Sequence, residues 1–65
     1  MKLSREKTDI ALARKRMTIT ELSKQYGVSR ARMNVILNQQ KVTPLCAGRI
    51  AEALGVDVTE ILADE

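Results

Sequence analysis

Helix-start signals recur along the chain, and helical spacing of apolar residues follows them. Thr18 and Glu21 have the spacing of a capping box, in which each side chain bonds the backbone N–H of the other residue. Asp57 and Glu60 repeat this spacing. Further residue types that favour the N-cap are Ser4, Ser29 and Thr43. This pattern predicts five helices, at about residues 4–16, 19–26, 30–37, 44–54 and 58–63.

Residues that end helices separate these segments. Gly27 and Gly55 can adopt a left-handed backbone, and Pro44 prevents a helix from continuing through the segment before it. The helix predicted at 44–54 has an apolar stripe at the spacing i, i+3, i+4, i+7, formed by Ala47, Ile50, Ala51 and Leu54. No stretch alternates long enough to indicate a strand. We therefore expect an all-α fold, a compact five-helix domain that spans residues 1–65.

Charge is distributed unevenly along the chain. Residues 1–49 contain all eleven Lys and Arg residues and three acids, whereas residues 50–65 contain five acids and no Lys or Arg. One end of the molecule is therefore suited to a polyanion, and the other would be repelled by it. The basic run Arg14-Lys15-Arg16 lies just before the second predicted helix, which brings cations to the start of that helix.

Composition argues against several classes of function. The chain has no His and a single Cys, and it lacks a Gly-rich phosphate loop or acids at ligand spacing. We therefore expect no enzyme activity, no metal, no cofactor and no small-molecule ligand. No apolar run approaches the ~20 residues of a membrane span. Cys46 has no partner for an internal disulfide, which favours a reducing cytoplasm.

The helices predicted at 19–26 and 30–37, joined by a turn at Gly27–Val28, form a helix-turn-helix unit over about residues 18–37. The second helix of such a unit enters the major groove of double-stranded DNA. Its inner face is expected to consist of Met33, Ile36 and Leu37. The residues that then project outward are Arg30, Ala31, Asn34 and Val35. Arginine can bond guanine, asparagine can bond adenine, and small apolar groups can meet a thymine methyl.

Three stretches of the chain resemble a known family. They are Met-Thr-Ile-Thr-Glu-Leu-Ser at 17–23, Tyr-Gly-Val-Ser-Arg at 26–30 and Arg-Ile-Ala-Glu-Ala-Leu-Gly-Val at 49–56. They are similar to the phage-repressor and Cro-like helix-turn-helix family, which includes lambda-repressor-like and XRE-type bacterial regulators. The resemblance covers about residues 11–62. It implies a five-helix fold, sequence-specific operator binding and a dimer on a pseudo-palindromic site.

The resemblance and the helix geometry together give candidate contacts. The residues expected near bases are Ser29, Arg30, Ala31, Asn34 and Val35. Those expected at backbone phosphates are Thr18, Ile19, Arg32, Asn38 and Lys41, the first two through the free N–H groups of a helix N-terminus. The chain departs from the family pattern at Ile19, which is often Gln, and at Gln39, which is often Gly. Val35 stands where a polar residue is common, so it either meets a thymine methyl or packs sideways.

The residues therefore favour a cytoplasmic transcriptional regulator of bacterial or phage origin that acts as a homodimer, and a repressor more than an activator. The alternative is a protein–protein interaction module, such as an antitoxin-like partner, on the same scaffold. Salt dependence separates DNA binding from a hydrophobic interaction module, because DNA binding weakens steeply with salt and hydrophobic association does not. Val56, Val58 and Leu62 fit either the core or a dimer patch.

Overall fold

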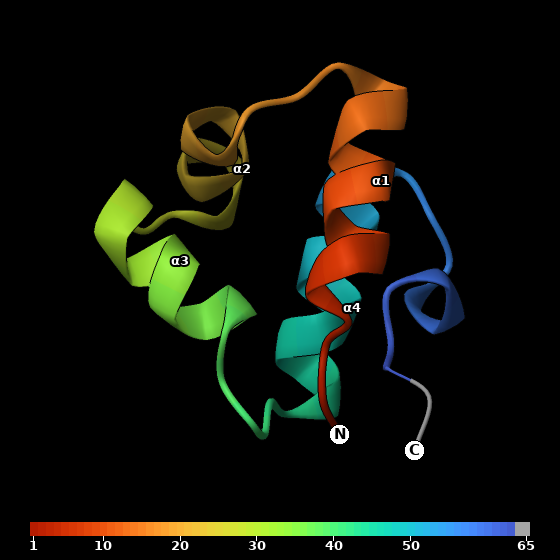
Figure 1. Cartoon of the computed structure of the whole chain (residues 1–65). Helices are drawn as coiled ribbons and strands as arrows, with labels where there is room; N and C mark the ends of the chain where they lie inside the picture. Colours follow the sequence, from red (N-terminus) through yellow and green to blue (C-terminus); the bar gives the residue numbers. More distant parts are fainter. Residues whose placement is uncertain (64–65) are drawn as a thin grey trace.

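The computed structural model describes residues 1–63, so the acids at 64–65 lie outside the described residues. Within 1–63 there are four α-helices: α1 (Arg5–Lys15), α2 (Ile19–Tyr26), α3 (Arg30–Leu37) and α4 (Pro44–Leu54) (Figure 1). The limits predicted for α2, α3 and α4 are confirmed. The first helix is slightly shorter than predicted, because Ser4 and Arg16 are its caps rather than its end residues.

Capping side chains determine where the helices begin. In each case a side-chain oxygen accepts a hydrogen bond from a backbone N–H in the first turn, and the residues that do so are Ser4, Thr18, Ser29 and Thr43. Left-handed backbone ends three of the helices. Gly27 has a φ of 96° after α2 and Gly55 a φ of 69° after α4. Arg16 has a φ of 53° after α1, and the sequence gives no signal for this strained position.

The prediction of a fifth α-helix at 58–63 is wrong. The segment makes only one 3-10 turn, Val58–Glu60, which the predicted capping box of Asp57 and Glu60 stabilises. Hydrogen bonds from Thr59 to the Asp57 carboxylate lower the pKa of that group below its ordinary value. A helix of this length is marginal by itself. The chain beyond it pairs with the N-terminal segment instead.

The paired segment joins the two ends of the described chain. Leu3 and Leu62 form an isolated antiparallel bridge. The Ser4 N–H donates to the Ile61 carbonyl at 2.8 Å, and the Ala63 N–H donates to the Lys2 carbonyl at 2.9 Å. These bonds satisfy backbone groups of two segments that lie outside the helices. They also bury Leu3 and Ile61, so the N-terminal segment is part of the core.

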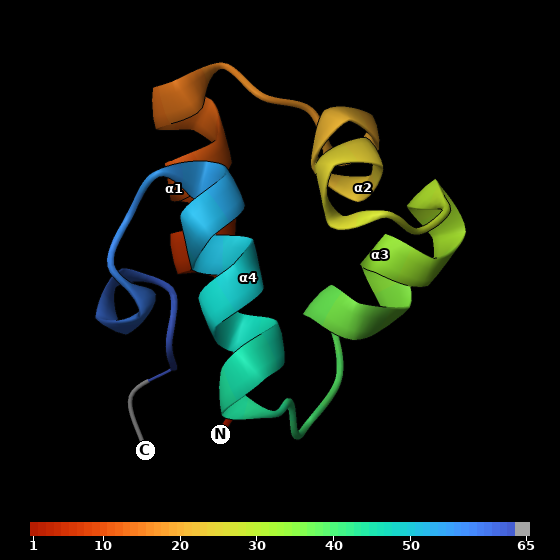
Figure 2. The same cartoon turned by 180° about the vertical axis from the view of Figure 1, so that it is seen from behind.

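Helix α4 lies at the centre of the packing. Its predicted apolar stripe is confirmed, since all four of its members are buried: Ala47, Ile50, Ala51 and Leu54. Helices α1 and α2 and the 3-10 turn all contact α4, while α3 packs mainly on α2. In Figure 2, α3 and the 3-10 turn lie on opposite sides of α4. Val56, Val58 and Leu62 are partly buried against the core, which favours the first of their two interpretations.

Two further features complete the packing. The buried hydroxyl of Thr8 donates to the Ser4 carbonyl at 2.7 Å, and that of Ser23 donates to the Thr20 carbonyl at 2.6 Å. Both polar groups are therefore satisfied within their own helices. None of the helices in residues 1–63 has the length and apolar character needed to cross a membrane.

Gly27 and Gly48 form a matched pair for testing the turn between α2 and α3. At Gly27 we expect Gly27→Ala to destabilise the fold by about 1 kcal/mol, because a left-handed backbone strains a residue with a Cβ. At Gly48, inside α4, a Cβ meets nothing within 4 Å. Gly48→Ala is expected to stabilise by about 0.5–1 kcal/mol through helix propensity. Thermal unfolding measures both changes in stability. Equal effects of the same sign would contradict a left-handed turn at Gly27.

Candidate nucleic-acid interface

One face of α3 is anchored in the core and the other is open to solvent. Met33, Ile36 and Leu37 are buried, as predicted. The remaining positions of the helix are solvent-accessible: Arg30, Ala31, Arg32 and Val35 are exposed, and Asn34 is partly exposed. The structure therefore orients the predicted base-contact residues of α3 away from the core. Val35 is 50 % exposed, so it does not pack sideways within this chain.

The polar groups on this face have weak or no intramolecular partners. Ser29 caps α3, because its Oγ accepts from the Arg32 N–H at 3.1 Å. The Asn34 Nδ2 donates to the Arg30 carbonyl at 3.3 Å, a long and exposed bond within the helix. The Arg30 side chain has no hydrogen bond or ion pair with any described residue. A ligand therefore has little to displace before it reaches these side chains.

The start of α2 is less open to a phosphate than the sequence indicates. The Thr18 N–H donates to Glu21 Oε1 at 3.0 Å, and Thr18 Oγ1 accepts from the Glu21 N–H at 3.1 Å. The capping box therefore occupies the polar groups of Thr18. Ile19 is half-buried against the core, which leaves only its backbone N–H for an anion. The Glu21 carboxylate beside it repels such a ligand.

The other predicted phosphate contacts lie at α3 and after it. Arg32 and Lys41 are exposed, and their side chains have no hydrogen bond or ion pair with another described residue. Asn38 is also exposed, and its Oδ1 accepts a hydrogen bond from Arg5 Nη1 at 3.2 Å. That bond leaves the Asn38 Nδ2 to donate elsewhere. All three can therefore take part in binding an anion.

The fold divides the eleven cations of the chain into two groups. Five have partners within the protein, namely Arg5, Lys7, Arg14, Lys15 and Arg49. The side chains of the remaining six make no hydrogen bond or ion pair within residues 1–63, and they are Lys2, Arg16, Lys24, Arg30, Arg32 and Lys41. Half of this second group lies on α2 and α3. The unpaired positive charge is therefore concentrated on and around the helix-turn-helix unit.

The basic run at the end of α1 contributes less than its sequence suggests. Arg14 Nη1 lies 3.5 Å from Glu60 Oε1, although both side chains are largely exposed and the pair adds little stability. Lys15 Nζ donates to the Ala53 carbonyl at 2.9 Å and so satisfies a carbonyl in the last turn of α4. Only Arg16 of this run has no such partner within the described chain.

Comparison with known proteins assigns the family of the chain. Residues 9–65 match the family model of the Cro/C1-type HTH DNA-binding domain. The chain belongs to this family. No curated protein and no solved structure matches it. The match makes DNA the partner of this helix-turn-helix domain, in agreement with the exposed, basic face of α3.

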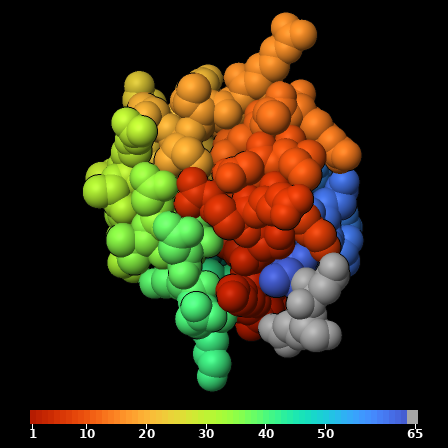
Figure 3. Space-filling view, viewed as in Figure 1, coloured from red at the N-terminus to blue at the C-terminus, as the bar shows by residue number. Residues whose placement is uncertain are grey.

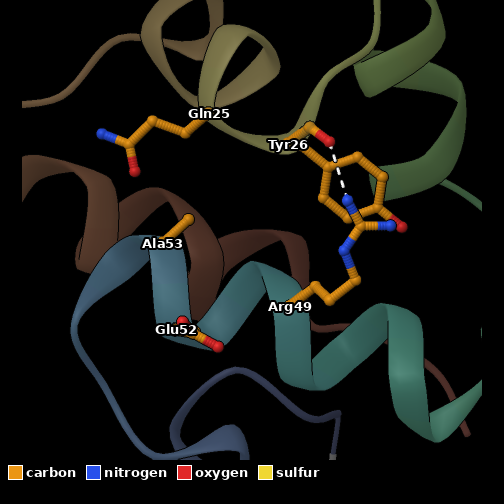
Figure 4. Close-up of a pocket in the computed structure, with 5 residues that line it drawn as sticks. All are labelled: Gln25, Tyr26, Arg49, Glu52 and Ala53. Carbon is orange, nitrogen blue, oxygen red and sulfur yellow. Dashed lines mark hydrogen bonds between the residues drawn. The ribbon is translucent and has the colours of Figure 1, made fainter.

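A contact that the sequence does not signal links α4 to the turn of this Cro/C1-type domain. Arg49 Nη2 donates to the Tyr26 carbonyl at 2.9 Å, and the guanidinium lies 4.2 Å from the centre of the Tyr26 ring (Figure 4). The hydrogen bond satisfies a carbonyl at the end of α2, and the stacking adds a cation–π interaction. Arg49 therefore attaches α4 to the residue that immediately precedes Gly27.

The surroundings of Tyr26 form a shallow hollow between α2 and α4. Its volume is about 230 Å³, and it is lined by Gln25, Tyr26, Arg49, Glu52 and Ala53 (Figure 4). A hydrogen bond with Cys46 is the largest effect that raises the pKa of the Tyr26 hydroxyl, and Arg49 opposes it. The hydroxyl therefore stays protonated at neutral pH. The hollow is smaller than most small-molecule pockets.

We predict that Arg49→Met lowers the free energy of unfolding by about 1 kcal/mol, because it removes a hydrogen bond and a cation–π contact together. Arg14→Met is the matched control, since it removes an equal charge from an exposed ion pair. We expect the control to change stability by less than about 0.5 kcal/mol. Urea unfolding measures both, and equal losses in the two variants would show that Arg49 does not attach α4 to the turn.

Proposed function

We propose that this domain binds double-stranded DNA in a sequence-specific way, with α3 in the major groove, and that it represses transcription. The observation that carries the proposal is the exposed face of α3, on a helix that its buried face holds rigidly in a Cro/C1-type fold. An α-helix fits the major groove of B-form DNA, where all four base pairs present different groups.

The side chains of this face have complementary roles in the proposal. Arg30 bonds the O6 and N7 of a guanine, and Asn34 bonds an adenine. Ala31 and Val35 contact thymine methyl groups, and Ser29 contacts a base at the N-terminal end of α3. Since each good bidentate pair contributes about 1–3 kcal/mol of discrimination, Arg30 and Asn34 carry most of the specificity.

Phosphate contacts fix the position of α3 but carry no sequence information. In the proposal, Arg32, Asn38 and Lys41 bind the backbone from α3 and the connection after it. The start of α2 has a smaller part, through the backbone N–H of Ile19 beside Thr18. Because these contacts are electrostatic, they make the affinity strongly dependent on salt.

We further propose that the regulator works as a homodimer in the cytoplasm of a bacterium or in its phage, and that residues 1–65 are one domain. A single α3 contacts few bases, and a two-fold dimer doubles the number. A dimer bound at a promoter blocks polymerase without enzyme activity and without a small-molecule ligand. We therefore propose neither an activity nor a small-molecule ligand for this domain.

Selection from a random library of duplex DNA, repeated at two salt concentrations, tests the function. The proposal expects a short motif with two-fold symmetry and an affinity that falls steeply with salt. Recovery of a motif without symmetry would retain DNA binding and overturn the homodimer. Absence of binding even at low salt would overturn the function and favour a protein-interaction module.

Arg30 and Arg32 separate base recognition from phosphate binding. We expect Arg30→Ala to lose about 1–3 kcal/mol on the selected site, with relaxed specificity at one base pair and little loss on random DNA. We expect Arg32→Ala, a matched change two residues away, to weaken binding equally on both duplexes. Titration of each variant with each duplex measures this. An equal loss on both duplexes for Arg30→Ala would exclude base recognition by Arg30.

A further inference from the structure

The fold holds the N-terminal segment beside the connection between α3 and α4. The Val42 N–H donates to the Met1 carbonyl at 2.8 Å on one side of the segment, and the Ala63 N–H donates to the Lys2 carbonyl on the other. Leu3, the next residue along the chain, is only 2 % exposed. Figure 3 shows the red N-terminal atoms against the green atoms that follow α3. The segment before α1 therefore has a fixed place next to the helix-turn-helix unit.

Asn38 connects this segment to the exposed face of α3. The positions Ala31, Asn34, Val35 and Asn38 follow one another at the spacing i, i+3, i+4, i+7, so they share one side of the helix. Asn38 is the C-cap and the last member of this stripe. A ligand that extends along the whole exposed face of α3 therefore comes close to Asn38 at the C-terminal end of the helix.

A hollow of about 340 Å³ opens at this end, between the N-terminal segment and the connection after α3. Polar side chains line it from both sides, among them Lys2, Arg5, Asn38, Gln39 and Gln40. Lys2 is exposed, and its ammonium group makes no hydrogen bond or ion pair within the described chain. Among the described residues, Asp9 is the only acid that contacts a cation of the hollow, and the cation that it contacts is Arg5.

Arg5 is oriented for a ligand by two hydrogen bonds. Its Nε donates to Asp9 Oδ1 at 3.1 Å, and its Nη1 donates to Asn38 Oδ1 at 3.2 Å. The remaining N–H groups of the planar guanidinium are available to another acceptor. Because the Asn38 Oδ1 already accepts from Arg5, the group that Asn38 offers to a ligand is its Nδ2, which is also a donor. The site thus combines two cations with N–H donors.

We propose that Lys2, Arg5 and Asn38 form a phosphate site that binds the DNA backbone at the C-terminal end of α3. The proposal rests on the DNA-binding function and extends the interface from the helix-turn-helix unit to the segment before α1. Arg5 has two roles in it, because it bonds the phosphate and orients the Asn38 amide. A phosphodiester fits this chemistry, since guanidinium and ammonium groups are strong phosphate donors.

The test compares Lys2→Gln and Arg5→Gln with Arg14→Gln, which removes an equal charge from the side of α1 near the 3-10 turn. Each protein is titrated with the same duplex at several salt concentrations. The plot of log K against log salt has a negative slope, and loss of one phosphate contact reduces its steepness by about 0.9. We expect Lys2→Gln and Arg5→Gln each to reduce the steepness by up to this amount. Each variant should weaken binding to selected DNA and to random DNA equally. Arg14→Gln is expected to keep the wild-type slope.

Slopes for Lys2→Gln and Arg5→Gln that equal the Arg14→Gln slope would overturn the phosphate site, while binding by the wild-type chain would leave the proposed function intact. Absence of wild-type binding would overturn both. A second variant, Asp9→Asn, retains Arg5 and removes the carboxylate that Arg5 contacts. It tests the site even if Arg5→Gln does not fold. We expect Asp9→Asn to bind DNA more tightly, and unchanged or weaker binding would count against the site.

Discussion

Burial of the apolar stripe of α4 is the interaction on which the other elements depend. Ala47, Ile50, Ala51 and Leu54 lie along one side of the helix, and α1, α2 and the 3-10 turn pack around it. In a chain of 65 residues with one aromatic residue, few other surfaces can exclude as much water. The small side chains at two of the four positions allow the neighbouring helices to approach α4 closely. Changes in this stripe therefore affect every element of the domain at once.

The position of α3 follows from α4 indirectly. Helix α3 packs mainly on α2, α2 packs on α4, and Arg49 bonds the end of α2 just before the left-handed turn at Gly27. The left-handed turn at Gly27 and the contacts of Arg49 thus fix the position of α3, the helix proposed to contact bases, relative to the core. The same fold gives five of the cationic side chains a partner in the protein and leaves six with no hydrogen bond or ion pair in the described residues, mostly near α2 and α3. Packing and electrostatics therefore favour the same face for DNA.

The sequence predicts what is encoded locally. Ser29 and Thr43 cap helices, Gly27 ends one, and the spacing of Met33, Ile36 and Leu37 identifies the face of α3 that is buried; all of these depend on residues within one turn of each other. The features that sequence reasoning missed join distant parts of the chain. The Leu3–Leu62 bridge replaces the end of the expected fifth helix, and the contacts of Arg5 with Asn38 and of Arg49 with Tyr26 span 33 and 23 residues. Neither periodicity nor capping carries information about such pairs, so the helix-turn-helix unit was predictable while the residues that support it were not.

The central claim is that the exposed face of α3 is the surface that meets DNA. Backbone amide chemical shifts, recorded for the free protein and with a duplex recovered by selection, test it most directly. The account predicts that the largest changes fall on residues 29–41, with smaller changes at 2–5 and almost none at 56–61. Large changes confined to the segment around the 3-10 turn, with α3 unaffected, would contradict it.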